Sequence, residues 1–318
     1  MLISLAAFGV ALVAAYLLTP VVRDAAHGAG LLDEPEERKL HDKPIPRLGG
    51  VAIGGAFYLG IAAALVVARL TSQPLDLETG DLPGILVGAA LIVGVGLLDD
   101  LQGMRARVKL VAQIVVALVA YGLGLSIDRL DGPWGSLDVG AWSLLLTVAW
   151  IVAVVNAVNL IDGLDGLASG VALTVLAGFY VIGVAQGRVD PVLPVMAAGA
   201  GGIIGFLRFN LHPASIIMGD TGSLLLGFLL AAVGISLLQA PGGGVPAWVP
   251  VVAVGVPLAD MAWAVVRRLA AGAPLFAPDK RHIHHQLLAA GLGRRGAMLV
   301  LWAISAGLGA LAILLALA

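Results

Sequence analysis

Residues 82–100 read LPGILVGAALIVGVGLLDD, an apolar run that ends in two adjacent aspartates, Asp99 and Asp100. A run of this kind predicts a helix that spans a membrane, because about 17–25 apolar residues cross the hydrocarbon core. A carboxylate at the centre of such a helix costs about 2.5–3.5 kcal/mol. We therefore expect acids in this setting to carry a function.

The composition agrees with a membrane protein. The chain has 318 residues, of which 60% are hydrophobic and 12% charged, and its mean hydropathy is +1.02, whereas average soluble domains carry roughly 25% charged residues. The net charge of −2 argues against a nucleic-acid partner. The absence of cysteine excludes disulfides, thiolate catalysis and cysteine-based zinc sites. The first segment lacks the positive start of a cleaved signal peptide, so we expect it to be the first span.

Apolar runs continue along the whole chain. Because they are continuous and not alternating, they predict helices and not a barrel. We find neither a tandem repeat nor a soluble domain, so the sequence predicts one all-α, polytopic transmembrane domain over residues 1–318. The ten expected spans are approximately 2–22, 48–68, 82–98, 108–125, 139–158, 167–185, 191–207, 222–240, 245–266 and 297–317.

The basic residues predict the orientation. Of 18 Lys and Arg residues, all except Arg69, Arg129 and Arg188 fall in one of the two alternating sets of loops. Loops rich in Lys and Arg stay in the cytoplasm. The sequence therefore predicts that both termini lie outside and that the polar motifs share the cytoplasmic face.

Two further acidic motifs stand at predicted cytoplasmic ends. In NAVNLIDGLDG, residues 156–166, polar residues recur every three positions as Asn156, Asn159, Asp162 and Asp165, a spacing that keeps them near one helix face. In MGDTGS, Asp220 opens a span, where it fits an N-cap and where a helix N-terminus also favours anions. We interpret these acids as the core of a metal-dependent active site at the membrane surface.

The Asp99–Asp100 pair supports this interpretation. Adjacent carboxylates repel, which raises one pKa unless a cation intervenes. A divalent ion would relieve the repulsion, and Mg²⁺ prefers oxygen ligands together with substrate phosphates. The alternative is that both acids cap the span as solvated loop residues.

The segment KRHIHH, residues 280–285, is a dense basic cluster. Its side chains Arg281, His282, His284 and His285 fit the binding of a diphosphate better than a zinc site, because the other polar groups supply hard oxygen ligands. A basic loop against anionic lipid is the alternative. The stretch RKLHDKPIPRLGG, residues 38–50, reads alone as a juxtamembrane segment that contacts lipid headgroups.

Other polar and small residues admit two interpretations each. Lys109 fits a snorkelling lysine and equally a phosphate ligand. Asp260 is expected to be a buried structural acid paired with Arg267 or Arg268. The abundant glycines, 43 in all, are expected to let membrane helices pack closely.

Taken together, the motifs resemble the polyprenyl-phosphate N-acetylhexosamine-1-phosphate transferase family, which includes MraY, WecA and TagO. The resemblance covers nearly the whole chain, with the motifs in the same order. They are Arg38-Lys39-x-His41-x-x-Pro44-x-Pro46-Arg47-x-Gly49-Gly50, Asp99-Asp100, Asn156-x-x-Asn159-x-x-Asp162-Gly163-x-Asp165-Gly166, Gly219-Asp220-Thr221-Gly222-Ser223 and His282-Ile283-His284-His285.

The resemblance implies a bacterial inner-membrane enzyme with about ten helices and a cytoplasmic cleft. It implies transfer of a sugar 1-phosphate from a UDP-N-acetylhexosamine to undecaprenyl phosphate, with release of UMP and with Mg²⁺ or, as a substitute, Mn²⁺. The spaced His-Ile-His-His resembles the WecA/TagO branch, whose usual donor is UDP-N-acetylglucosamine, and not the MraY branch. A homodimer is common in that family.

The resemblance also assigns roles by position. Asp220 and Asn159 resemble the metal ligands, Asp99 the group that aligns or deprotonates the lipid phosphate, and Asp100 its partner. Leu164 and Asp165 fall where the family contacts uracil. The further expected substrate-binding residues are Lys109, Asn156, Asp162, Arg281, His282, His284, His285, His41 and Arg47. We favour a single displacement over a covalent phospho-aspartate route.

Two other classes of membrane protein would have different motifs. A CDP-alcohol phosphotransferase would need a further pattern of Ala-Arg and spaced aspartates after Asp162, and that pattern is not found. A transporter would need acids near the middle of its spans and repeated halves. The acids here are expected at one face.

Overall fold

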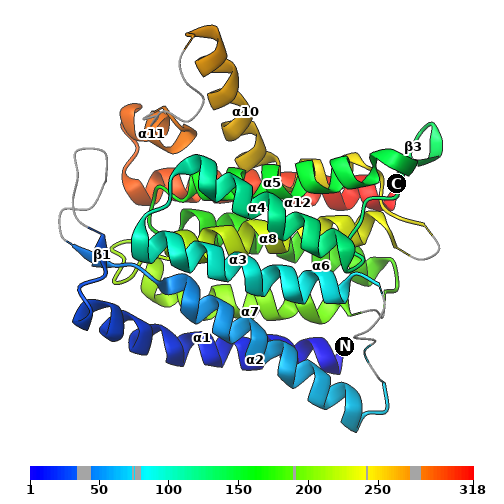
Figure 1. Ribbon diagram of the computed structural model, residues 1–318, viewed down its shortest axis with the longest axis horizontal. Helices are drawn as coiled ribbons and strands as arrows, with labels where there is room; N and C mark the ends of the chain where they lie inside the picture. Colours follow the sequence, from blue (N-terminus) through cyan, green and yellow to red (C-terminus); the bar gives the residue numbers. More distant parts are fainter. Residues whose placement is uncertain (34–43, 74, 76–79, 189–190, 241–242, 273–280) are drawn as a thin grey trace.

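The protein is a bundle of long helices that lie side by side along the long axis of the molecule (Figure 1). The computed structural model describes residues 1–33, 44–73, 75, 80–188, 191–240, 243–272 and 281–318. Both chain ends lie at the end of the bundle that carries β3, whereas β1 and α11 lie at the opposite end (Figure 1). The loops that carry the polar motifs therefore gather at the end remote from the termini.

Eight segments are long and apolar enough to cross a membrane, which confirms a mostly helical, polytopic membrane protein. They are α1 (Leu2–Gly28), α2 (Gly49–Leu70), α3 (Leu82–Gln102), α5 (Ser143–Ile161, preceded by the 3-10 turn Gly140–Trp142), α6 (Leu167–Ala185), α7 (Val192–Asn210), α8 (Gly219–Leu238) and α12 (Arg294–Leu317).

Two of the ten expected spans fold differently from these eight. The run 108–125 forms α4 (Ala106–Gly122), a helix of 17 residues. The run 245–266 is divided into α9 (Trp248–Ala253) and α10 (Gly255–Ala270). The break has a local cause, because Pro257 has no N–H to bond the carbonyl of Ala253 and its ring crowds that carbonyl. Beyond the break, α10 projects out of the bundle (Figure 1).

Helix α8 is the centre of the bundle. It packs against α2, α3, α5 and α6, and every residue from Thr221 to Leu238 is buried. Its sequence is apolar on all sides, as expected for a helix without an exposed face. In the outer helices α1 and α12, only 33% and 28% of the most apolar stretch is buried. The polar residues at the start of α8 are therefore held by helices on several sides.

Glycine permits the closest helix contacts, as expected from the sequence. A Cβ atom at Gly50 of α2 would overlap the backbone of Gly222 in α8, and one at Gly96 of α3 would lie 2.5 Å from the Cα of Thr221. On the other side of the bundle, Gly201 and Gly205 of α7 meet the backbone of α1. These contacts bring α2 and α3 onto the first turn of α8.

Two short antiparallel hairpins complete the fold and were not expected in an all-α chain. Strands β1 (Leu32–Asp33) and β2 (Ile45–Pro46) pair at the end that carries the polar motifs. There, the N–H of Ile217 donates to the carbonyl of Pro46, so this hairpin fixes the chain that enters α8. Strands β3 (Arg129–Gly132) and β4 (Gly135–Asp138) pair at the opposite end. The short helix α11 (Ile283–Ala289) precedes α12.

The close contact at Gly96 is testable by substitution. Gly96→Ala forces a methyl group against the α8 backbone, and overpacking of this kind costs about 1–3 kcal/mol. The matched control is Gly94→Ala on the same helix, where a Cβ meets no atom within 4 Å. We expect thermal unfolding of the purified protein in detergent to show a lower midpoint for Gly96→Ala only. Equal midpoints for the two variants would contradict the proposed close approach of α3 and α8.

Candidate active site

Asp100 caps the first turn of α8 from a neighbouring helix. Its Oδ1 accepts the N–H of Asp220 at 2.9 Å, and its Oδ2 accepts the N–H and the hydroxyl of Thr221 at 2.9 and 2.6 Å. Backbone N–H groups in the first turn of a helix have no partner within that helix. The expected N-cap role of Asp220 therefore belongs to Asp100, and this cap fixes the backbone of Asp220.

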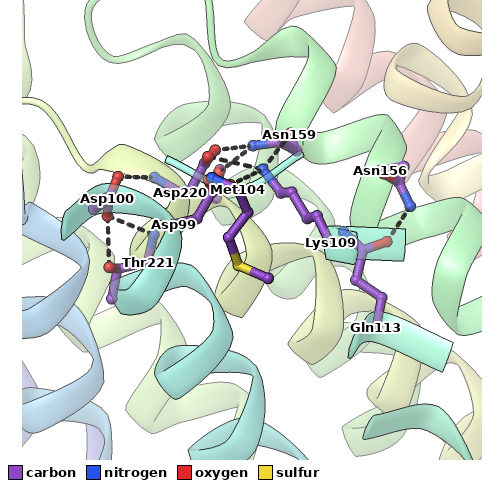
Figure 2. Close-up of polar contacts among 10 residues, drawn as sticks. Asp99, Asp100, Met104, Lys109, Gln113, Asn156, Asn159, Asp220 and Thr221 are labelled. Carbon is purple, nitrogen blue, oxygen red and sulfur yellow. Dashed lines mark hydrogen bonds and ion pairs between the residues drawn. The ribbon is translucent and has the colours of Figure 1, made fainter. Parts of the chain in front are cut away.

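Lys109 of α4 joins three helices through one ammonium group. Its Nζ lies 2.9 Å from Asp99 Oδ2 of α3 and 2.8 Å from Asp220 Oδ2 of α8. It also donates to Asn159 Oδ1 of α5 at 3.3 Å. Figure 2 shows these side chains converging from four helices. The lysine is thus a bound cation among oxygen atoms and does not snorkel to solvent.

The remaining polar atoms of this cluster are also bonded. Asp99 Oδ1 accepts the N–H of Met104 at 2.6 Å, which orients the carboxylate. Asn159 Nδ2 donates to Asp220 Oδ1 at 2.6 Å and to Ser223 Oγ at 2.8 Å. The three oxygens Asp99 Oδ2, Asp220 Oδ2 and Asn159 Oδ1 consequently face one positive charge. Oxygen donors of this type are those that hard divalent cations prefer.

A polar pocket of about 520 Å³ adjoins the cluster. Asp220 and Asn159 line the pocket and also contact Lys109, whereas Lys109 and Asp99 do not line it. The pocket is lined by Asp33, Arg47, Asp100, Asn159, Asp162, Gly163, Leu164, Asp165, Asn210, Ile217, Gly219, Asp220, His285 and Arg294.

The loop after α5 forms one wall of this pocket. Burial, together with the charges of Asp220 and Asp100, raises the pKa of Asp162 to about 8, so this group carries a proton at neutral pH. Asp165 Oδ2 pairs with His212 Nδ1 at 2.7 Å and accepts the N–H of Ala214 at 3.1 Å. These contacts hold the loop against the segment that leads from α7 to α8.

Asn210, the last residue of α7, connects the same two segments. Its Oδ1 accepts the N–H of Gly166 and the hydroxyl of Ser169, each at 3.1 Å, and its Nδ2 donates to the carbonyl of Ile216 at 3.1 Å. All polar atoms of this buried amide are therefore used to fix the pocket wall.

The three histidines of the HIHH segment have different environments. Only His285 lines the pocket. His284 is buried, and its ring lies where a Cβ of Gly163 would be. Burial lowers the pKa of His284 to about 4, so His284 is neutral at pH 7 and adds no positive charge. His282 is also buried, and its Nδ1 lies 2.7 Å from Asp260 Oδ2.

The structure brings together most, but not all, of the expected site residues. Asn156 donates to Gln113 Oε1 at 2.6 Å and to the carbonyl of Val152 at 2.8 Å, so its amide faces α4 and not the pocket (Figure 2). Arg281 is exposed. Arg47 lines the pocket with its Nε buried and unpartnered. His41 lies outside the described residues.

Several pocket residues were not predicted from the sequence. Gly219 was quoted as part of the motif around Asp220 but was given no role, and Asn210 and Ile217, which precede that motif, were not predicted. Asp33, which precedes Glu34, and Arg294, which precedes Arg295 at the start of α12, belong to none of the motifs quoted above. Asp260 was expected to pair with Arg267 or Arg268, which stays a prediction, whereas the structure shows contacts of Asp260 with His282 and Ile283.

Fold and site together define a polytopic membrane protein in which an acidic cluster around Lys109 adjoins a polar pocket. Comparison with known sequences gives the family. Residues 82–238 match the glycosyl transferase family 4, a range that runs from α3 to the end of α8 and includes the whole Lys109 cluster.

Relatives of known name match almost the full chain. A probable undecaprenyl-phosphate N-acetylglucosaminyl 1-phosphate transferase of Bacillus subtilis is 37% identical over 300 residues, which cover 94% of this chain and 81% of the relative. A decaprenyl-phosphate N-acetylglucosaminephosphotransferase of Mycobacterium tuberculosis is 36% identical, covering 90% and 76%. An undecaprenyl-phosphate alpha-N-acetylglucosaminyl 1-phosphate transferase of Yersinia pestis is 32% identical, covering 88% and 76%. The chain belongs to this family of polyprenyl-phosphate N-acetylhexosamine-1-phosphate transferases.

The cap on α8 makes a prediction about stability. Thr221→Val keeps the shape of the side chain but removes the hydroxyl that donates to the buried Asp100. A hydrogen bond to a charged group contributes about 1.5–3 kcal/mol, so we expect a lower unfolding midpoint. Thr71→Val is the control, because Thr71 is exposed and bonds only within its own helix end. An unchanged midpoint in Thr221→Val would argue against the cap.

Proposed function

We propose that this protein transfers N-acetylglucosamine 1-phosphate from a UDP-N-acetylhexosamine, most readily UDP-N-acetylglucosamine, to undecaprenyl phosphate and releases UMP. The observation that carries the proposal is the convergence of Asp99, Asp220 and Asn159 on Lys109 beside a polar pocket. The names of the relatives support the sugar and the polyprenyl phosphate. The product would open the synthesis of a cell-envelope polysaccharide.

The reaction is a phosphoryl transfer. An oxygen of undecaprenyl phosphate attacks the phosphorus that bears the sugar, a new P–O bond forms, and the bond from that phosphorus to the UMP oxygen breaks. Such reactions depend chiefly on alignment and on charge stabilisation. Asp99 would align the acceptor phosphate and take its proton if it is protonated, and Lys109 would hold phosphate oxygens.

We propose Mg²⁺, with Mn²⁺ as a substitute, as the cofactor. Asp220 and Asn159 would hold the ion, because their oxygens already face a cation and are of the type that Mg²⁺ prefers. When bound, the ion would neutralise charge on the diphosphate as UMP leaves. In this proposal Asp100 does not bind the ion itself, because its oxygens accept hydrogen bonds from the first turn of α8. It instead fixes the backbone of Asp220.

The pocket would hold the UDP-sugar. Leu164 and Asp165 would contact the uracil, and Asp162 would face the nucleotide from the same wall. The cationic side chains Arg47 and Arg294, with His285, line the same pocket and would face the diphosphate. Asn156 would contribute indirectly, through its bond to Gln113 of α4.

We propose ten crossings of the bacterial inner membrane, with α4 and the α9–α10 pair completing the eight long helices. Two observations support this topology. The termini lie at the opposite end from the pocket loops (Figure 1), and those loops carry most of the Lys and Arg residues. The pocket would then open to the cytoplasm, where UDP-sugars are made, and a homodimer would be the assembly to test.

Activity tests the proposal directly. We expect purified protein to release UMP from UDP-N-acetylglucosamine only when undecaprenyl phosphate is present. Asp220→Asn should lower the rate by at least about 100-fold, because it removes a charge that a phosphoryl-transfer site requires. Asp138→Asn, an exposed acid of β4 at the other end of the bundle, is the control. Full activity in a folded Asp220→Asn variant would show that the mechanism does not need Asp220. If the unaltered protein were inactive with every UDP-N-acetylhexosamine, the proposed function would be refuted.

Metal removal gives a separate test. We expect EDTA to stop UMP release, and excess Mg²⁺ to restore it to the starting rate, with Mn²⁺ restoring part of it. As a control, Ca²⁺ is added in place of Mg²⁺ after the EDTA treatment, which shows whether the reaction specifically requires the smaller Mg²⁺ ion. A rate that EDTA leaves unchanged would eliminate the metal from the proposed chemistry.

A further inference from the structure

Asp260 is a buried acid that the proposed chemistry does not use. It lies on α10, is 5% exposed, and belongs to a part of the chain outside the residues that match the family. Its Oδ2 lies 2.7 Å from His282 Nδ1, and its Oδ1 accepts the N–H of Ile283 at 2.7 Å. Both oxygens therefore bind the start of α11, which is the HIHH segment.

These two bonds fix different properties of the segment. Ile283 is the first residue of α11, and its N–H has no acceptor within that helix. The contact at Nδ1 sets the orientation of the His282 ring, and when that nitrogen carries the proton, it leaves Nε2 as the acceptor. Asp260 thus fixes the backbone and a ring of the same loop.

The constraint extends from His282 to the pocket. The rings of His282 and His284 are parallel, with centroids 6.0 Å apart and planes at 6°. His284 packs against Gly163, the residue after Asp162, and its ring centroid lies 4.2 Å from that of His285. Since His285 and Asp162 both line the pocket, a shift at Asp260 would reach two of its walls.

We propose that Asp260 is a positioning residue for the donor nucleotide. It does not touch the substrate, and it holds the HIHH segment so that His285 faces the diphosphate of the UDP-sugar in the pocket. This inference rests on the proposed function, because it takes the pocket to be the UDP-sugar site. The nearby His282, which the sequence placed at the substrate, acts in this arrangement as the link between Asp260 and the wall.

Kinetics of Asp260→Asn test the proposal. Asparagine has the size of aspartate but only one acceptor oxygen. It therefore cannot accept hydrogen bonds from both His282 Nδ1 and the N–H of Ile283. In metal sites, loss of a partner that orients a ligating side chain costs about 10–100-fold in affinity or activity, and we expect an effect of the same order here. We expect the KM for UDP-N-acetylglucosamine to rise at least about ten-fold, with the KM for undecaprenyl phosphate and kcat changed far less. Asp138→Asn is the matched control and should leave all three values unchanged.

A double-variant comparison separates positioning from general damage. If Asp260 acts through the HIHH segment, Asp260→Asn combined with His285→Ala should raise the KM no further than His285→Ala alone. If the rise in KM in the double variant equalled the product of the rises in the two single variants, the proposal would be overturned. An unchanged KM in a folded Asp260→Asn variant would also overturn it. If that variant does not fold, His282→Gln tests the same contact from the other side, with the same expected rise.

Binding of UDP distinguishes this inference from the proposed function. We expect UDP to raise the unfolding midpoint of the unaltered protein without undecaprenyl phosphate, and to do so at about ten-fold higher concentration in Asp260→Asn. If the unaltered protein neither binds UDP nor releases UMP, the proposed function fails and the inference with it. If it does both, and Asp260→Asn binds UDP equally well, the inference alone fails.

Discussion

The site depends on one ammonium group that three helices share. Asp99 and Asp220 carry two negative charges and lie on either side of Lys109, which carries one positive charge. Two carboxylates so close together, one of them the buried Asp99, would repel each other where water is partly excluded. The lysine makes their approach tolerable, and it fixes α3, α4, α5 and α8 relative to one another. A formal charge of −1 remains on this trio, which is the sign that attracts a divalent cation.

Adjacent residues on a helix face different directions, and the pair Asp99–Asp100 illustrates the consequence. Successive side chains on an α-helix are separated by roughly 100°, so Asp99 meets Lys109 and Asp100 meets the first turn of α8. The two acids therefore have different roles. Asp100 supplies hydrogen-bond acceptors to backbone N–H groups, as Asp260 does for α11. In both cases a carboxylate from one helix caps the start of another and so fixes residues that line the pocket.

The sequence predicts the long helices well because hydrophobic length is a local property. It also predicts that Asp99, Asn159 and Asp220 meet, since their motifs stand at the same ends of alternate spans. It does not predict partners that are distant in sequence and have no motif. The bond between Asn156 and Gln113 turns an expected pocket residue toward α4. The contact of Asp260 with His282 depends on the break near Pro257, where α10 begins its separate course. The metal ion, the membrane orientation and the assembly stay predictions.

The arrangement around Asp220 and Asn159 favours single displacement over a covalent intermediate. Both residues line the pocket and contact Lys109, whereas Asp99 and Lys109 do not line it. A displacement at phosphorus places the attacking and leaving oxygens roughly in line, on opposite sides of the phosphorus atom. With the donor in the pocket and the acceptor phosphate beside Lys109, which contacts the pocket residues Asp220 and Asn159, the two phosphates would be neighbours and would need no intermediate on the protein. A phospho-aspartate route would require one carboxylate to face the donor freely. The oxygens of Asp220 are instead bound by Asn159 and Lys109, and those of Asp100 are bound by the first turn of α8. These hydrogen bonds and the ion pair therefore support the single displacement that we propose.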